Sequence, residues 1–126
     1  MIIKCSRVRA RGPALKRLID HVENAEDNES VVALRGNYAD LWDARRDARQ
    51  YGREYAVAHW ILSPAREVTD EQMAKAVDLL AKEFGFDLSR AVVRGHRKSK
   101  ANESLFDRHV HVLAPMVDPT GAVLSL

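Results

Sequence analysis

The spacing between hydrophobic residues changes several times along this chain. Short runs rich in apolar and β-branched residues predict strands at 2–8, 30–35, 54–62, 90–96 and 108–113. Apolar residues three or four apart predict helices that open after Pro13, after Asn37 and after Thr69. This order indicates an α+β fold: a two-layer sandwich in which an antiparallel-rich central sheet carries helices packed mainly on one face.

The third predicted helix has the clearest boundaries. Thr69-Asp-Glu-Gln72 forms a capping box before an apolar stripe, and Gly85 is expected to end the helix. Trp60, in the third strand, and Trp42, in the second helix, both fall within apolar stripes. We therefore expect both tryptophans in the core.

Composition limits the class of protein. With 126 residues, 46% of them hydrophobic, we expect a single domain that covers residues 1–126. There is no apolar run of about 18 residues and no signal-peptide pattern, so we expect an intracellular protein without a membrane segment. Cys5 is the single cysteine. It cannot form an internal disulfide and is expected to be a small buried hydrophobe.

The candidate chemistry lies in the last two predicted strands. The run Arg108-His-Val-His-Val-Leu113 alternates, so His109 and His111 share a face and lie about 6.5 Å apart along the strand. An antiparallel hairpin through residues 97–107 would bring His96 beside them. The spacing predicts a three-histidine metal site; the plainer interpretation is a set of solvent-facing polar positions. Imidazole ligands suit Mn, Zn, Ni, Cu or Fe better than Mg or Ca.

Basic residues cluster near both ends of the chain although the net charge is only +2. They include Arg7 and Arg9 in the first strand, and Arg97, Lys98 and Lys100 beside the histidines. Such residues favour a phosphate-bearing substrate.

Several short segments follow one another in an order that points to a known protein family. They are Met1-Ile-Ile-Lys4, Gly12-Pro-Ala-Leu15, Asn28-Glu29, Arg35-Gly36, Ala58-His-Trp-Ile-Leu-Ser-Pro64, Thr69-Asp-Glu-Gln72, Phe84-Gly85, Val92-Val-Arg-Gly-His96 and His109-Val-His111. Together they resemble the N-terminal catalytic part of a relaxase, the mobilisation nuclease that nicks one DNA strand at a plasmid transfer origin. The resemblance covers nearly the whole chain. Because relaxases generally continue past this point, it also implies a chain truncated at its C-terminus.

The resemblance implies a site, a reaction and partners. His96, His109 and His111 would hold Mn²⁺ or Mg²⁺ against the scissile phosphate, with Mn²⁺ bound more tightly. The reaction would be a site- and strand-specific nick through a covalent phospho-enzyme on the 5′ side, leaving a free 3′-hydroxyl. The partners would be single-stranded DNA at a transfer origin, relaxosome accessory proteins and a type IV secretion coupling protein, in the bacterial cytoplasm. The DNA phosphates would be contacted, without reading of bases, by Arg7, Arg9, Arg97, Lys98 and Lys100.

The chain departs from the common relaxase pattern at the nucleophile, because the first predicted helix contains no tyrosine. His21 is the candidate instead. Some relaxases of this kind use a histidine here, and a neutral imidazole attacks phosphorus without first losing a proton. Tyr38 is the alternative nucleophile. Glu29 is a candidate orienting partner for His21, and His59 would either orient the nucleophile or pack in the core.

Two other functions stay open at this point. A non-catalytic metal- or DNA-binding module with the same fold would account for the missing tyrosine. A replication-initiator nuclease shares the histidine pair, but it would place a tyrosine in a helix after the pair, and none lies there. A covalent DNA adduct on His21 or Tyr38 distinguishes a relaxase-like enzyme from a binding module.

Overall fold

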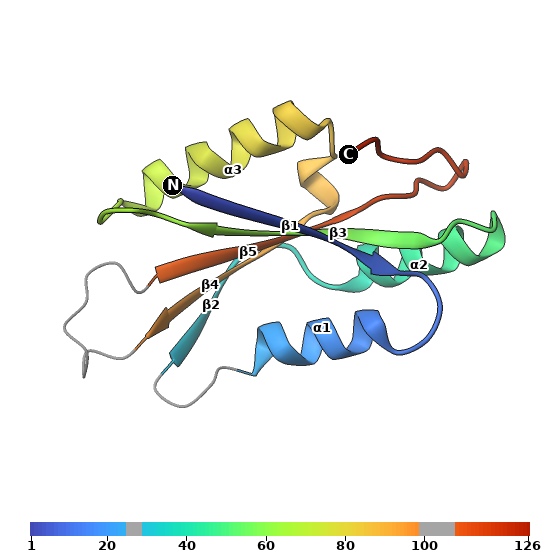
Figure 1. The fold of residues 1–126 in the computed structure, drawn as a ribbon, viewed down its shortest axis with the longest axis horizontal. Coiled ribbons are helices and arrows are strands. Elements are labelled where there is room, and N and C mark those ends of the chain that lie inside the picture. Colours follow the sequence, from blue (N-terminus) through green and yellow to red (C-terminus); the bar gives the residue numbers. More distant parts are fainter. Residues whose placement is uncertain (25–28, 99–107) are drawn as a thin grey trace.

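The structure is a computed structural model that describes residues 1–24, 29–98 and 108–126. In this described part, five strands and three α-helices follow one another, and β4 and β5 come last (Figure 1). The bounds are β1 Ile2–Arg9, α1 Ala14–Glu23, β2 Glu29–Arg35, α2 Ala39–Gln50, β3 Tyr55–Ser63, α3 Asp70–Phe84, the 3-10 helix η1 Leu88–Arg90, β4 Val92–Lys98 and β5 Arg108–Pro115.

The five described strands form one sheet in the order β1-β3-β5-β4-β2, and every neighbouring pair is antiparallel. β4 and β5 pair as the sequence predicted, with His96 opposite His109. The predicted α+β class and antiparallel sheet are therefore confirmed. Within the described residues, no helix combines the length and the apolar character needed to cross a bilayer.

Helices cover both faces of the sheet. Figure 1 shows α1 and α2 on one side of the sheet and α3 on the opposite side. Two of the three described α-helices thus share one face, as the sequence predicted. On the α3 side, the ring of Trp60 lies 5.4 Å from that of Phe84 and 4.8 Å from that of Phe86, between centroids. The central strands β3 and β5 are buried along most of their length without alternation. Such strands need cover on both faces.

The signals predicted at the ends of α3 are present. The Thr69 hydroxyl accepts a hydrogen bond from the Gln72 backbone N–H at 3.1 Å, and the Gln72 side chain accepts one from the Thr69 N–H at 2.8 Å. Gly85, with φ 72°, ends the helix in the left-handed conformation. Local sequence thus determines both boundaries.

Two expectations about the core were wrong. Trp60 is fully buried, but Trp42 is 38% exposed. The inward stripe of α2 consists of Leu41, Ala44 and Ala48, and Trp42 lies beside it on the helix surface. Cys5 is exposed as well, because β1 forms an edge of the sheet.

Gly36→Ala should strongly destabilise the fold. Gly36 has φ 74°, and a Cβ there would overlap the carbonyl oxygen of Ala91. A left-handed alanine alone costs about 1–2 kcal/mol, and the backbone clash should raise the loss in free energy of unfolding to about 3 kcal/mol or more. Urea denaturation measures this loss. Gly12→Ala is the matched control, because Gly12 also has φ 74° but nothing within 4 Å; equal losses in the two variants would contradict the clash.

Candidate metal centre

The five histidines of the chain lie in one cluster centred on His111. The distances from its ring centroid to the others are 4.4 Å to His96, 5.1 Å to His59 and His109, and 6.3 Å to His21. They come from α1, β3, β4 and β5. A residue type that gathers at one place from four elements indicates a site rather than scattered surface positions.

The register of the sheet accounts for four of these positions. His96 lies opposite His109, and His59 lies opposite Leu113, two residues from His111. Opposed residues share a face of the sheet, and so do alternate residues of one strand. The four strand histidines therefore point to the same side of the sheet, which is the side of α1 and α2.

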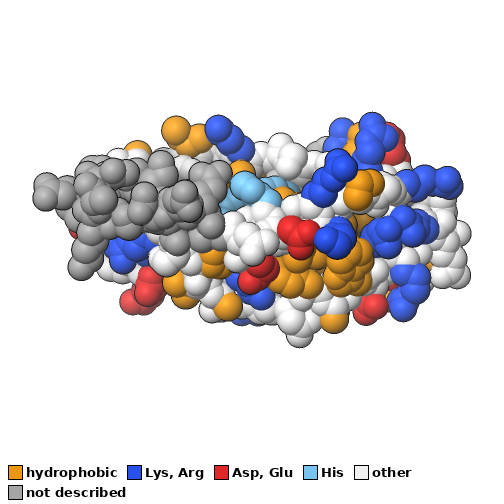
Figure 2. All heavy atoms as spheres, turned by 90° about the horizontal axis from the view of Figure 1, so that it is seen from below, with side chains coloured by type: hydrophobic (Ala, Val, Ile, Leu, Met, Phe, Trp, Pro, Cys, Tyr) orange, Lys and Arg blue, Asp and Glu red, His pale blue; other side chains and the backbone are white. Residues whose placement is uncertain are grey.

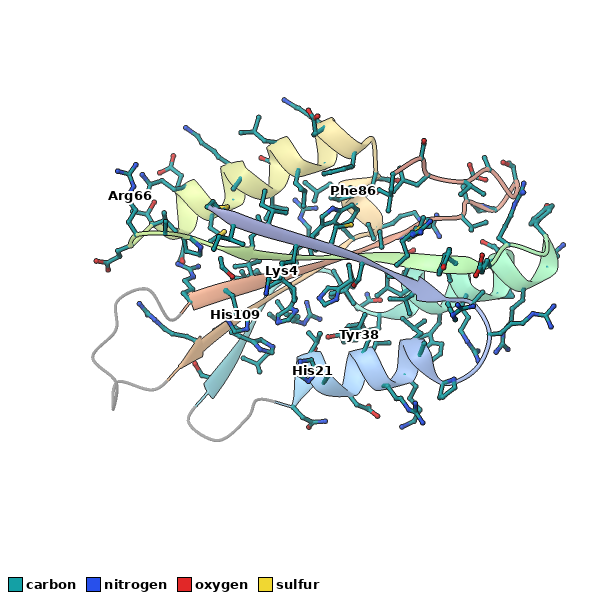
Figure 3. All side chains as sticks on the ribbon, viewed as in Figure 1. Lys4, His21, Tyr38, Arg66, Phe86 and His109 are labelled. Atoms are coloured by element: carbon teal, nitrogen blue, oxygen red, sulfur yellow. The ribbon has the colours of Figure 1, made fainter. Side chains whose placement is uncertain are left out.

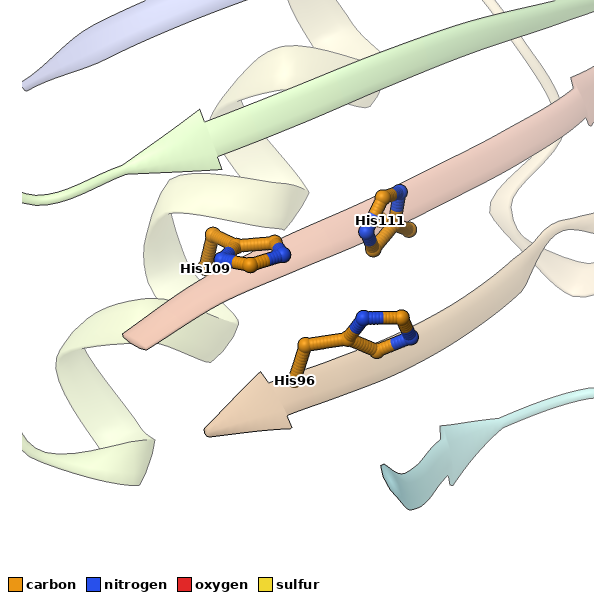
Figure 4. Close-up of side chains that lie close together, drawn as sticks. All are labelled: His96, His109 and His111. Carbon is orange, nitrogen blue, oxygen red and sulfur yellow. The ribbon is translucent and has the colours of Figure 1, made fainter. Parts of the chain in front are cut away.

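His96, His109 and His111 are arranged as ligands for one metal ion (Figure 4). One ring nitrogen from each lies within 4.8 Å of the others. Nitrogens bound to one ion at about 2.1 Å lie about 3–4 Å apart, so an inward shift of about 1 Å is enough to coordinate it. Within residues 1–24, 29–98 and 108–126, the buried Nε2 of His111 has no hydrogen-bond partner. A bound cation would satisfy this atom, so the donor set fits a metal ion.

Hydrogen bonds on the other ring nitrogens orient two of these ligands. His96 Nε2 donates to the carbonyl oxygen of Val22 at 2.7 Å, so the lone pair of the neutral ring is on Nδ1. His111 Nδ1 lies 2.8 Å from His59 Nε2. When His111 donates in this pair, its lone pair is on Nε2, the atom available to a metal. In that tautomer, His59 would orient the His111 ring rather than act as a further ligand.

Burial keeps the two central histidines neutral. Desolvation, followed by the charges of neighbouring histidines, lowers the pKa of His111 to about 3. Desolvation, followed by the charge of His21, lowers the pKa of His59 to about 4. Neutral imidazole is the form that binds a cation, so His111 is ready to act as a ligand at neutral pH. A neutral His59 ring can share a hydrogen bond with it.

His21 faces the cluster from the last turn of α1 (Figure 3). Its ring is nearly perpendicular to that of His111, at 83°. The end of α1 is attached to β4 by the Val22–His96 hydrogen bond and by Glu23, which accepts from Arg94 Nε at 2.9 Å. His21 itself is exposed. Figure 2, which views the molecule from below, shows histidine side chains at its surface.

The alternative nucleophile, Tyr38, is engaged in other contacts. Its hydroxyl donates to the Glu23 carboxylate, and the guanidinium of Arg94 lies 5.1 Å from its ring centroid. Burial, and then the hydrogen bond to Glu23, raises the pKa of Tyr38 well above its usual value. The phenolate that attack on phosphorus requires therefore forms less readily than in a free tyrosine. The sequence pattern did not reveal this cluster, because Glu23, Tyr38 and Arg94 meet only in the fold.

The candidate DNA-binding residues of β1 lie away from the histidines. The guanidinium groups of Arg7 and Arg9 are 4.4 Å and 5.7 Å from the ring centroid of Tyr55. Ser6 lies opposite His59, so its neighbour Arg7 points to the other face of the sheet. The structure does not bring these two arginines to the candidate metal centre.

The remaining predicted residues lie near the end of the β4–β5 hairpin or outside the described residues. Arg97 is exposed, and by strand alternation it points away from the face of His96. The side chains of Lys98 and Glu29 and the whole of Lys100 lie outside the described residues. The suggested role of Glu29 as a partner of His21 stays a prediction.

Sequence reasoning missed one basic residue on the histidine face. Lys4 lies opposite Ile61 of β3, and Ile61 lies opposite His111 of β5. Its place is set by the pairing of β1 with β3 and of β3 with β5. No local pattern around Lys4 carries that information.

Comparison with known proteins identifies no relative: no protein-family model, curated protein or solved structure matches this chain. The geometry of the histidine cluster is therefore what indicates a function.

His59→Ala should weaken Mn²⁺ binding about 10- to 100-fold, because His111 loses the partner that orients its ring. Isothermal titration calorimetry measures the affinity, and circular dichroism confirms that the variant folds. His59→Gln is the matched control, since its amide can replace the ring nitrogen as a hydrogen-bond partner, and it should retain more of the affinity. Equal affinities of wild type and His59→Ala would contradict the positioning role.

Without metal, His59 and His111 should make stability depend on pH. Their pKa values in the folded state, about 4 and about 3, lie below the value of about 6.5 expected in an unfolded chain. Below pH 6.5 the unfolded state therefore binds more protons, and the free energy of unfolding falls as the pH drops toward 4. For His59 alone this loss is about 2 kcal/mol between pH 7 and pH 5.

Urea denaturation in EDTA at pH 7 and pH 5 measures this dependence. The double variant His59→Gln/His111→Asn lacks both of these histidines but keeps every carboxylate of the wild type. It should therefore lose less stability over this interval than the wild type. A loss as large as that of the wild type would show that these histidines are not held neutral.

Proposed function

We propose that this protein is a relaxase-type nuclease domain that nicks single-stranded DNA at a transfer origin by metal-assisted transesterification. The observation that carries the proposal is the convergence of all five histidines: three arranged as metal ligands, one orienting a ligand and one facing the cluster from α1. Packing alone does not require such a set. A nucleophile beside a metal centre is what phosphoryl transfer requires.

His96, His109 and His111 would hold the divalent ion. When bound, Mn²⁺ or Mg²⁺ supplies positive charge that polarises a phosphoryl oxygen and offsets charge developing in an in-line displacement. The three ligands are neutral imidazoles, so they cancel none of that charge, and the centre attracts an anionic substrate. Imidazole ligands bind Mn²⁺ more tightly than Mg²⁺, while Mg²⁺ serves through its abundance.

His21 is the nucleophile in this proposal. Its ring nitrogen forms a bond to phosphorus while the bond from phosphorus to the 3′-oxygen breaks. The leaving oxygen takes up a proton from water, and the phosphorylated imidazole releases its own ring proton. The products are a 5′-phosphoryl histidine and a 3′-hydroxyl. Tyr38 is the weaker candidate, because its hydroxyl donates a hydrogen bond to Glu23 and its raised pKa keeps the hydroxyl protonated.

The cellular setting follows from this function. The partners would be a transfer-origin strand, relaxosome accessory proteins and a type IV secretion coupling protein, in the bacterial cytoplasm. A non-catalytic metal-binding module is the second candidate function. It is favoured by the engagement of Tyr38 with Glu23 and by the absence of a tyrosine from the first helix.

The deciding experiment is a search for a covalent adduct. Single-stranded DNA of random sequence, labelled at its 3′ end, is incubated with the protein and Mn²⁺, and labelled protein is recovered under denaturing conditions. The wild type should carry label, because the 3′ fragment stays attached through its 5′ phosphate. The adduct should be acid-labile, as a phosphorus–nitrogen bond is, and His21→Ala should reduce it at least 100-fold while still binding Mn²⁺.

Tyr38→Phe is the matched variant and should keep most of the labelling. An acid-stable adduct that disappears in Tyr38→Phe would show that the nucleophile is Tyr38 and not His21. No labelling of a folded, Mn²⁺-loaded wild type by any DNA sequence would overturn the nuclease proposal in favour of the binding module.

A further inference from the structure

β1 carries two polar side chains on the face of the candidate metal centre. Lys4 lies in one cross-strand row with Ile61 and His111, and Ser6 lies directly opposite His59. Residues in such rows point to the same side of the sheet. In Figure 3, Lys4 is labelled on the side of β1 toward α1, the side of the labelled His21.

The spacing allows Lys4 to act beside the metal without displacing a ligand. Two strand spacings separate Lys4 from His111, about 10 Å between their Cα atoms. The four-carbon side chain of a lysine extends about 6 Å. Its ammonium group can therefore contact an anion bound at the metal centre. Lys4 is exposed, so this movement disrupts no packing.

Two arginines of the histidine-bearing strands are already paired. The ion pairs are Arg94 with Glu23 and Arg108 with Asp70. Among the residues that the structure describes, none forms an ion pair with the Lys4 side chain. Its charge is therefore available to a ligand.

We propose that Lys4 forms an anion subsite next to the metal centre and binds a phosphodiester oxygen of the substrate. Three neutral ligands leave the charge of a divalent ion uncompensated, and Lys4 adds a further positive charge on the same face. A phosphodiester group matches this charge and supplies an oxygen to each cation. The identification of that phosphate with a DNA backbone rests on the proposed function; the anion subsite itself does not.

The first test uses a probe that contains no DNA. Dimethyl phosphate is titrated against Mn²⁺-loaded protein, and paramagnetic relaxation of its ³¹P resonance reports binding next to the metal. Lys4→Met should lower the affinity about fivefold or more, as expected for the loss of a charge-assisted hydrogen bond. Lys4→Arg should retain binding. Lys75→Met, on α3 at the opposite face of the sheet, is the charge-matched control and should behave as wild type.

Calorimetry of Mn²⁺ binding separates this subsite from the metal ligands. Mn²⁺ affinity should be the same in wild type, Lys4→Met and Lys75→Met, since Lys4 is not a ligand. Equal dimethyl phosphate affinities in wild type and Lys4→Met, at equal Mn²⁺ loading, would overturn the proposal.

A second test addresses the identity of the anion. The affinity for single-stranded DNA of random sequence is measured over a range of salt concentrations. Loss of one phosphate contact in Lys4→Met should reduce the slope of log affinity against log salt by about 0.7. If the wild type binds dimethyl phosphate through Lys4 but binds no DNA, the anion subsite is supported and the nuclease function fails. An unchanged slope in Lys4→Met would overturn its assignment to the DNA backbone.

Discussion

The antiparallel register of β3, β5 and β4 is the constraint on which the candidate site depends. Each pairing sets which residues share a face, so the positions of His59, His96, His109 and His111 follow from it together. A slip of one residue in β5 would move both of its histidines to the opposite face of the sheet, where α3 lies. Such a slip would also bring buried valines of β5 to the side of α1. Burial of both faces of the central strands therefore protects the geometry of the site.

The helix that carries His21 depends on the same sheet. Val22 and Glu23, the next residues of α1, are bonded to His96 and Arg94 of β4. Arg94 is buried and also donates to the carbonyl oxygens of Arg35 and Gly36, so it ties the end of β2 to the end of α1. Because His96 is itself a candidate ligand, occupation of the metal centre and the placement of α1 are physically linked. His21 is thus held next to the cluster by its two neighbours in sequence.

The electrostatics of the cluster would favour an anionic ligand once a divalent ion is bound. Desolvation and mutual repulsion hold its two innermost rings neutral. The predicted ligand set contains no carboxylate, so a bound divalent ion would keep its charge in a region of reduced dielectric constant. Glu23, at the end of α1, accepts hydrogen bonds from Tyr38 and Arg94. Within the described residues, the candidate ligand set is made of histidines alone, so a metal-loaded centre would attract an anion such as phosphate.

The sequence by itself determined the elements and the three metal-ligand candidates. The capping box at Thr69 and the glycine stop at Gly85 act through local backbone geometry, and the alternation of His109 with His111 follows from the period of a strand; all of these are readable without a fold. Three-dimensional pairing decided the rest. The His59–His111 hydrogen bond, the position of Lys4, the opposite orientation of Arg7 and the exposure of Trp42 depend on which strands are neighbours and which helix covers which face. Contacts between residues some 50 apart, such as His59 and His111, leave no periodic trace in the chain, so only the tertiary structure reveals them.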